Sequence, residues 1–212
     1  MRAVLASIHS RLLQALALYL AQPVKRQRSW STRDPQQLAA VLVHGDVLLT
    51  DGNSRMAALV RRVTRSTWAH VAMYVGPLEA GPDPRCIVEA DIAVGVRAVR
   101  LSELKDLRVG VLRHGGLDET QRRRLADWVV SRIGGEYDLA HALALATRLL
   151  RPPPASPPPP APEAMARGTS RFICSTLLAQ AFLLAGYPIV PDHGYVTPRD
   201  FETAAALQPV PT

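Results

Sequence analysis

The chain has 212 residues, of which 48% are hydrophobic, and this is enough for one globular domain with a substantial core and attached segments. The formal net charge is +7, almost all of it from arginine, because Lys25 and Lys105 are the only lysines. Basic residues do not alternate with aromatic ones, and the sequence has no zinc-finger, helix-turn-helix or RNA-recognition pattern, so we expect no nucleic-acid partner. An anionic membrane surface is the other partner that such a charge attracts.

Residues 1–28 are expected to form an amphipathic helix with a basic flank. Apolar side chains recur at helical spacing from Leu5 to Leu20. The longest uninterrupted apolar run, residues 15–21, is too short to span a bilayer. We expect this helix either to pack on the domain or to lie in an anionic membrane interface. The protein is expected to be cytoplasmic, either free or peripheral on the inner face of the membrane, with export as the alternative.

Residues 35–212 are expected to form the main domain. Its first half combines apolar strands with one amphipathic helix. In chain order we expect a short helix after Pro35, a strand introduced by the Gly45-Asp46 turn, a helix at 55–65, strands at 69–76 and 86–94 on either side of a Gly/Pro-rich turn, and strands at 95–101 and 108–113.

The second half of this domain is expected to be mainly helical. Capping residues and glycine stops predict its helices from Asp118 to Gly134, from Tyr137 to Leu150, from Cys174 to Gly186 and from Thr197 onward. The proline-rich segment at 152–162 is expected to loop out as an exposed insertion, because proline supports neither a helix nor a ladder of strands. A ligand for a proline-recognition module is the alternative function of this loop.

The chain contains two cysteines, Cys86 and Cys174, which excludes a disulfide-rich scaffold. The sequence has no C-x-x-C, H-E-x-x-H or EF-hand pattern, so we expect no metal site. The P-loop and the dinucleotide-binding fingerprint are also missing from it, and we expect no cofactor.

Cys174 lies where an apolar, strand-like stretch gives way to a helix. Unpaired amides and the positive end of the helix dipole stabilise a thiolate at such a position. Cys174 is therefore a candidate nucleophile, although a cysteine followed by apolar helix residues is also typical of a small buried side chain. Cys86 begins a predicted strand with no base nearby, and we interpret it as structural.

A thiol nucleophile needs a base and a third group that orients the base. His70 lies on the strand before the Gly/Pro-rich turn, and two carboxylates lie on the strand after it. With 76–85 as the turn, facing residues should sum to about 161, which places Asp91 opposite His70 and Glu89 one diagonal step away. Both acids are within cross-strand reach, so the pattern leaves the choice open. A packed histidine and a solvated surface charge are the alternatives for these positions.

Six short segments occur in a fixed order: GDVLLT, AHVAMYVG, IVEADIAVGVRAVRL, GGEYD, FICSTLLAQAF and the tail element TPRDF. This order resembles that of the YiiX/YebB-like, circularly permuted NlpC-type cysteine hydrolases of the papain-like superfamily, over residues 41–207. The resemblance implies an α+β, permuted papain-like (NlpC-type) fold in which an antiparallel sheet or partial barrel packs against helices. The proline-rich insertion and the N-terminal helix depart from the family's pattern.

For the site, the resemblance implies Cys174 as the nucleophile, His70 as the base and Glu89 as the orienting acid. It also favours Glu89 over Asp91. These residues follow the order His, Glu, Cys, whereas the cysteine comes first in the unpermuted relatives.

Two tyrosines are candidate substrate-binding residues. Tyr137 belongs to the YD element of the resemblance and is expected to line the cleft, with a packed aromatic at a helix start as its alternative role. Tyr74 shares a strand face with His70 by the two-residue period of a strand.

The resemblance implies a cysteine hydrolase that acts on amide bonds in peptides or cell-wall-type peptides through an acyl-thioester intermediate. The second hypothesis is a membrane-associated lipid acyl hydrolase or acyltransferase, similar to the lecithin:retinol acyltransferase branch of the superfamily. The third is a non-catalytic binding module on an inactive papain-like scaffold. The expected partner is a peptide or an acyl-containing substrate.

Overall fold

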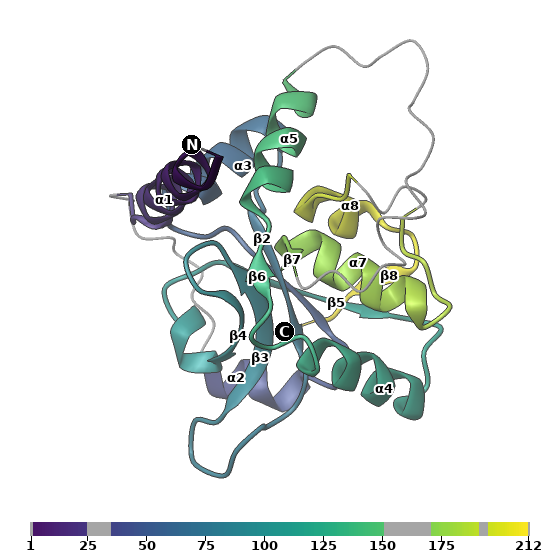
Figure 1. The fold of residues 1–212 in the computed structure, drawn as a ribbon. Coiled ribbons are helices and arrows are strands. Elements are labelled where there is room, and N and C mark those ends of the chain that lie inside the picture. Colours follow the sequence, from purple (N-terminus) through teal and green to yellow (C-terminus); the bar gives the residue numbers. More distant parts are fainter. Residues whose placement is uncertain (1, 25–34, 151–170, 191–194, 212) are drawn as a thin grey trace.

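The computed structural model describes residues 2–24, 35–150, 171–190 and 195–211 (Figure 1). The proline-rich insertion predicted at 152–162 lies outside these residues, as does the basic flank of the N-terminal segment. Within the described part, the chain forms a central sheet with helices packed around it (Figure 1).

The central sheet is open and antiparallel, with the strand order β4-β3-β2-β1-β5-β8. Its strands are β1 (Val47–Thr50), β2 (His70–Tyr74), β3 (Arg85–Asp91), β4 (Gly95–Arg100), β5 (Val109–His114) and β8 (Leu207–Pro209). A separate two-stranded parallel sheet joins β6 (Glu136–Tyr137) to β7 (Arg171–Phe172). The antiparallel sheet expected from the sequence is confirmed.

Helices flank both faces of the sheet and confirm the α+β class (Figure 1). They are α1 (Arg2–Ala21), α2 (Pro35–Val41), α3 (Arg55–Thr64), α4 (Glu119–Val130), α5 (Leu139–Leu149), α7 (Cys174–Leu184), α8 (Pro198–Thr203) and the short 3-10 helix η1 (Leu101–Leu104). The expected helices at 55–65 and from Cys174 onward are therefore confirmed, the first ending one residue earlier than predicted.

Alternate residues of the strands enter two cores. Val47 and Leu49 of β1 belong to the core that α4 and α7 close, whereas Leu48 belongs to the core that α2 and η1 close. All three side chains are essentially inaccessible to solvent. Fully burying such a side chain stabilises a fold by about 1.5–3 kcal/mol, so the two cores hold the helices firmly against the sheet. The start of α7 is thereby fixed relative to β2.

The hairpin of β2 and β3 has the predicted register. Met73 pairs with Val88 and Tyr74 with Ile87, which confirms the expected pairing sum. Strand β3 ends at Asp91, earlier than the predicted limit at residue 94. The Asp91 carboxylate accepts hydrogen bonds from the backbone amides of residues 93 and 94, and this contact closes a turn in place of a longer strand.

Helix α1 covers residues 2–21 of the N-terminal segment and packs on the domain. Ala17 and Leu20 contact a third apolar cluster formed mainly by α3 and α5, and the Arg55 guanidinium lies 4.0 Å from the centre of the Tyr19 ring. The outward face carries Leu12 and Leu16, which are 64% and 36% exposed. Within the described residues, α1 and the other helices are too short or too polar to cross a membrane.

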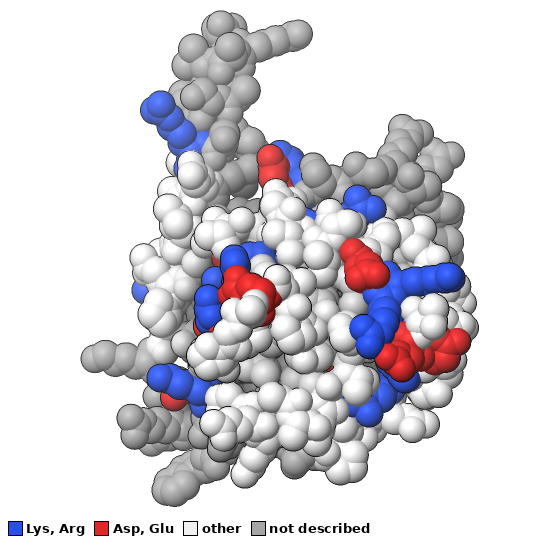
Figure 2. Space-filling model, turned by 90° about the horizontal axis from the view of Figure 1, so that it is seen from below, with Lys and Arg blue, Asp and Glu red and all other residues white. Residues whose placement is uncertain are grey.

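The surface charges intermingle on the face shown in Figure 2, where acidic side chains lie beside basic ones. Exposed ion pairs are a general feature of this chain: Glu79 pairs with both Arg85 and Arg100, and Glu119 pairs with Arg123. On this face the arginine excess does not form a continuous basic surface (Figure 2).

Candidate active site

Cys174 is the first residue of α7, and Ile173 alone separates it from the short strand β7. The helix begins here because the Thr176 hydroxyl accepts a hydrogen bond from the backbone amide of Ile173 and the following apolar residues pack on the sheet. The thiol is 8% exposed, and the backbone amides of Val71 and Ser175 donate hydrogen bonds to it. The expected position of Cys174 at a helix N-terminus is confirmed.

His70 is the first residue of β2, and its imidazole lies between Cys174 and Glu89. Its Nε2 is 2.9 Å from Oε2 of Glu89. An ionised carboxylate only accepts hydrogen bonds, so Nε2 carries a proton and Nδ1 is the nitrogen left for the thiol. A side-chain hydrogen bond joins His70 to Cys174. The three side chains therefore form one chain of contacts.

The charges of these groups stabilise one another. Burial alone would lower the pKa of His70, but the negative charge and hydrogen bond of Cys174, followed by those of Glu89, raise this pKa well above its usual range. Burial raises the pKa of the Cys174 thiol, but the charge and hydrogen bond of His70 and the two backbone amides outweigh it, so the thiol pKa is lowered. The geometry therefore favours a thiolate beside an imidazolium.

Glu89 is the carboxylate that contacts His70. Its side chain is 11% exposed; burial alone would raise its pKa, but the hydrogen bond and charge of His70, followed by those of Arg97, lower it to about 2. Nε and one terminal nitrogen of Arg97 lie 3.0 and 2.8 Å from Oε1 of Glu89. Asp91 instead caps the turn after β3 and lies 3.5 Å from the Arg97 guanidinium.

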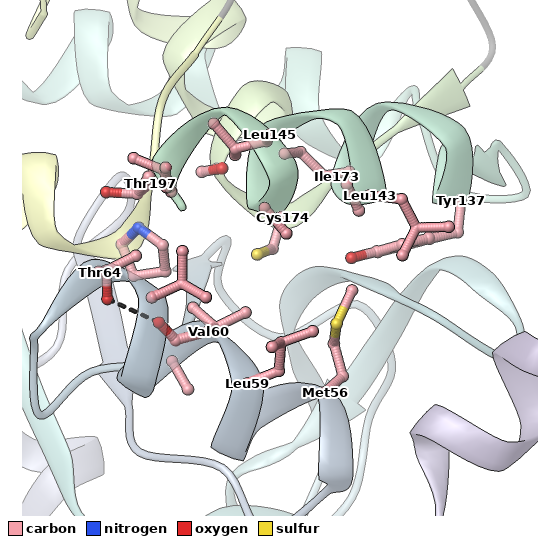
Figure 3. Close-up of a pocket in the computed structure, with 17 residues that line it drawn as sticks. Met56, Leu59, Val60, Thr64, Tyr137, Leu143, Leu145, Ile173, Cys174 and Thr197 are labelled. Atoms are coloured by element: carbon pink, nitrogen blue, oxygen red, sulfur yellow. Dashed lines mark hydrogen bonds between the residues drawn. The ribbon is translucent and has the colours of Figure 1, made fainter. Parts of the chain in front are cut away.

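Tyr137 ends β6 and pairs with Phe172 of β7, two residues before the cysteine. Its hydroxyl points toward the Cys174 sulfur (Figure 3). Burial, followed by the charge of Cys174, raises the pKa of the Tyr137 phenol well above its usual range. The hydroxyl therefore stays neutral and keeps its proton for donation.

Cys174 and Tyr137 line two pockets at once. The first pocket, of about 530 Å³, lies between α3 and α5 and is almost entirely apolar (Figure 3). Its apolar lining includes Met56, Leu59, Val60, Val63, Leu143, Leu145, Ala146 and Leu149. The second, of about 850 Å³, is more polar and is lined by His70, Glu89 and Asp91 together with loop residues 52–54. The sulfur thus lies between an apolar and a polar compartment.

Comparison with known proteins identifies the family. The model of a family described as permuted papain-like amidases of the YaeF/YiiX type, the C92 family, matches residues 41–145. The chain belongs to this YiiX-like family. The matched segment contains His70 and Glu89 and ends before Cys174. No curated protein matches the sequence.

A solved structure shares the fold of this YiiX-like chain. The crystal structure of YiiX from Escherichia coli O157:H7, described as a metalloprotein, aligns over 79% of this chain and 96% of its own, with 17% identity and a TM-score of 0.55. The likeness confirms the permuted papain-like architecture. In the part of the present chain that the structure describes, there is no group of three or more His, Cys, Asp or Glu side chains that could hold a metal ion.

Tyr74 of this YiiX-like chain lies elsewhere. It lines a third pocket, of about 640 Å³, with His44 and residues of α4, and it is not among the residues that line the two pockets at Cys174. On the strand face predicted to be shared by His70 and Tyr74, Tyr74 packs against the core closed by α2 and η1, whereas His70, at the start of β2, lines the polar pocket. The structure therefore does not bring Tyr74 to the candidate site.

Cys86 is also remote from the site of this YiiX-like chain. It is buried in the core closed by α2 and η1, and burial raises the pKa of its thiol to about 11. A thiol that stays protonated at neutral pH is a poor nucleophile, which agrees with the structural role expected for Cys86.

Sequence reasoning misses two features of the site. The sequence patterns do not single out Arg97. Aligning the strands on either side of the turn at 92–94 would have placed Arg97 opposite Glu89, and the observed register pairs these two residues. Sequence reasoning also misses the apolar pocket, because α3 and α5 are far apart in the sequence and only the folded chain brings them together.

Proposed function

We propose that the protein is a cysteine amidase in which Cys174 is the nucleophile, His70 the base and Glu89 the group that orients His70. The observation that carries this proposal is the chain of contacts from the thiol to the imidazole and from Nε2 of the imidazole to a buried carboxylate. A nucleophile, a base and an orienting acid in contact are the arrangement that covalent acyl transfer requires. Membership of a family of permuted papain-like amidases supports amide bonds as the target.

The first half of the proposed reaction forms a thioester. The Cys174 thiolate attacks the carbonyl carbon of the amide, and the carbonyl oxygen becomes an oxyanion. The backbone amide of Cys174, which has no partner within the helix at this position, donates to the oxyanion. The His70 imidazolium then gives its proton to the nitrogen of the leaving amine, the carbon–nitrogen bond breaks, and the acyl group stays on sulfur.

The second half returns the enzyme to its starting state. His70, now neutral, takes a proton from a water molecule, and the resulting hydroxide attacks the thioester carbon. The carbon–sulfur bond breaks, the acid is released, and the thiolate–imidazolium pair is restored. Glu89 keeps the imidazole oriented throughout, and Tyr137 is the proposed substrate-binding residue because its neutral hydroxyl points toward the sulfur (Figure 3). Amide bonds in peptides or cell-wall-type peptides are the proposed substrates.

The proposal is tested by labelling the protein with an acyl-mimetic electrophile and measuring its intact mass. The wild type is expected to gain one adduct, located at Cys174 by peptide mapping, while Cys174→Ala gains none. Cys86 supplies the internal control, because its buried thiol has a raised pKa and should remain unmodified under the same conditions. An adduct that persists in Cys174→Ala would show that Cys174 is not the nucleophile. If the wild type forms no adduct, the result favours the third hypothesis, a non-catalytic binding module on an inactive scaffold.

The apolar pocket favours a second candidate function, the hydrolysis or transfer of a lipid acyl group through the same thiol. A thioester on Cys174 would place an acyl chain beside the side chains of α3 and α5, where apolar surface predominates. A peptide substrate with charged residues would bury them there at a cost. The acyl donor and acceptor would then decide between hydrolase and acyltransferase activity.

The length of the acyl chain should reveal which candidate applies. If the apolar pocket holds the chain, kcat/KM for an octanoyl ester or amide should exceed that for the butanoyl analogue by up to about 200-fold, because each of the four additional methylenes contributes about 0.8 kcal/mol when buried. Leu145→Asp, which places a charge in the pocket wall, should abolish most of this preference. Leu184→Asp, at an exposed position of α7, is the matched control. Equal rates for both chain lengths would speak against the lipid candidate.

Membrane association through α1 is part of the lipid proposal. Leu12, Leu16 and Tyr19 lie on one exposed face of this helix, and Ala21 at its end lines the polar pocket. The wild type should sediment with vesicles that contain anionic lipid, and replacing Leu12 and Leu16 by glutamate should reduce the bound fraction severalfold, since it removes apolar contact and adds repulsive charge. Replacing exposed Leu78 by glutamate is the control. Unchanged binding of the α1 variant would rule out this surface.

A further inference from the structure

Arg97 lies beside Glu89 on the side away from His70. Strands β3 and β4 pair with Glu89 directly opposite Arg97, so the two side chains share one face of the sheet. The guanidinium contacts Oε1 of Glu89 through Nε at 3.0 Å and a terminal nitrogen at 2.8 Å, whereas Oε2 is 2.9 Å from Nε2 of His70. Each oxygen of the carboxylate therefore has its own partner.

The guanidinium is itself held from two further directions. Asp91 of β3 lies 3.5 Å from it, and Glu103 of η1 lies 3.8 Å from it. The Arg97 side chain is 41% exposed and the Glu89 side chain 11% exposed, so a partly solvated cation covers a nearly buried carboxylate. Because three carboxylates surround the cation, the rigid fork of the guanidinium has a defined orientation.

We propose that Arg97 is a positioning residue for the Cys174–His70–Glu89 site: by holding Oε1 of Glu89, it keeps Oε2 directed at His70. A glutamate side chain has several rotatable bonds, and one contact to an imidazole leaves much of that freedom. The second contact, from Arg97, restricts the carboxylate to the orientation that keeps Nδ1 of His70 toward the thiol. The inference rests on the proposed function, since it assigns Arg97 a role in the same reaction.

Removing Arg97 should have one effect if the residue positions Glu89 and the opposite effect if it acts only as a positive charge. As a charge alone, Arg97 repels an imidazolium, so its removal would stabilise the His70 cation and increase the thiolate fraction. As a positioning group, its removal releases Glu89, weakens the support of the imidazolium and decreases the thiolate fraction. The charged or titratable groups that face this pair are His70 from β2, Asp91 from β3, Glu103 from η1, Tyr137 from β6 and Cys174 from α7.

The test measures how fast iodoacetamide alkylates Cys174 at about pH 6.5, near the ordinary pKa of an imidazole, with the product quantified by peptide mass. Arg97→Gln is expected to slow alkylation about tenfold, equivalent to about 1.4 kcal/mol, and Arg97→Lys to recover most of the rate. Arg100→Gln is the matched control, because Arg100 lies on the same strand, is similarly exposed and pairs with Glu79. With a substrate in hand, kcat should fall in parallel while KM stays unchanged.

Further variants separate the outcomes. In a Glu89→Gln background, Arg97→Gln should cause no additional loss, because Arg97 acts through the carboxylate. Alkylation that is unchanged or faster in Arg97→Gln overturns the positioning role, and so does an additional loss in the double variant. If Arg97→Gln does not fold, Arg97→Lys is the deciding variant, because one ammonium group replaces the contact that two guanidinium nitrogens make with Glu89. An alkylation rate of Arg97→Lys equal to that of the wild type would then contradict the proposal.

Failure of the proposed function gives a different result. If wild-type Cys174 reacts no faster at this pH than a free small-molecule thiol, the activated cysteine itself is absent. If the wild type reacts fast and Arg97→Gln reacts equally fast, only the role of Arg97 fails.

Discussion

Replacing Cys174 by alanine is expected to reduce hydrolysis of an amide substrate to the background rate, a loss of about 10⁴-fold or more. The sulfur is the only atom in the proposed site that forms a bond to the acyl group, so no neighbouring side chain replaces it. The measurement is kcat/KM for the purified variant, beside intact-mass analysis for an acyl adduct. Cys174→Ala removes a single buried sulfur atom, so the loss of stability should be small beside the loss of activity.

Two controls accompany this measurement. Cys86→Ala should retain wild-type activity, because Cys86 lies in the other core and lines neither pocket at the site. His70→Ala should lose a similar factor to Cys174→Ala, and the double variant should lose no more than either single variant, as groups that act as one unit do. Substantial activity of Cys174→Ala, with unchanged fold by circular dichroism, would refute the covalent mechanism.

The pH dependence of activity is expected to show a broad plateau with both limits displaced outward. The thiol pKa is lowered, so the acid limit of the thiolate–imidazolium pair should lie below the ordinary thiol range. The His70 pKa is raised well above its usual range, so the pair should persist as the pH rises and be lost only when the imidazolium deprotonates at the alkaline limit. Measuring kcat/KM across the pH range locates both limits.

Glu89→Gln is the variant with the largest expected effect on this profile. It removes the negative charge that helps to hold the His70 pKa up, so the alkaline limit should move to lower pH and the plateau should narrow. Activity at the plateau should fall about 10- to 100-fold, because an amide still accepts a hydrogen bond but no longer balances the charge. Asp91→Asn, on the same strand, is the comparison: the Asp91 carboxylate caps a turn and lies 3.5 Å from Arg97, so this variant should affect the pH profile less than Glu89→Gln does. If Asp91→Asn shifts the pH profile and Glu89→Gln leaves it unchanged, Asp91 and not Glu89 is the acid that orients His70.

The position of Cys174 can be predicted from the sequence because the change from strand to helix is local. A short apolar stretch, a capping threonine and an apolar helix all lie within a few residues of it. The pairing of β2 with β3 is also predictable, because the Gly/Pro-rich turn has clear limits and the strands alternate cleanly. Together these two local patterns are enough to bring His70 close to a carboxylate and to place the thiol at a helix start.

The choice between Glu89 and Asp91 cannot be made from the strand pattern. The register alone places Asp91 opposite His70, yet the chain turns at Asp91 and that carboxylate is occupied by backbone amides. Whether a side chain at the end of a strand faces its partner or caps the next turn depends on where the strand stops. The apolar pattern continues to residue 94, whereas the strand ends at Asp91.

Tyr74 and the apolar pocket show a second reason for incomplete prediction. Strand alternation assigns a face to each residue, but it does not say which part of that face is open and which is covered by a helix from elsewhere in the chain. Tyr74 faces His44 and residues of α4, and the apolar pocket lies between α3 and α5. Both depend on tertiary packing, whereas the contacts of His70 depend on one hairpin and one helix start.

Whether His70 holds Cys174 as a thiolate can be measured by titrating the ultraviolet absorbance of the thiolate in the purified protein, with Cys174→Ala as the blank. We expect a thiolate signal that persists well below the ordinary thiol pKa in the wild type and disappears from that range in His70→Ala. A signal that appears only at or above the ordinary thiol pKa, or one that His70→Ala leaves unchanged, would contradict this expectation.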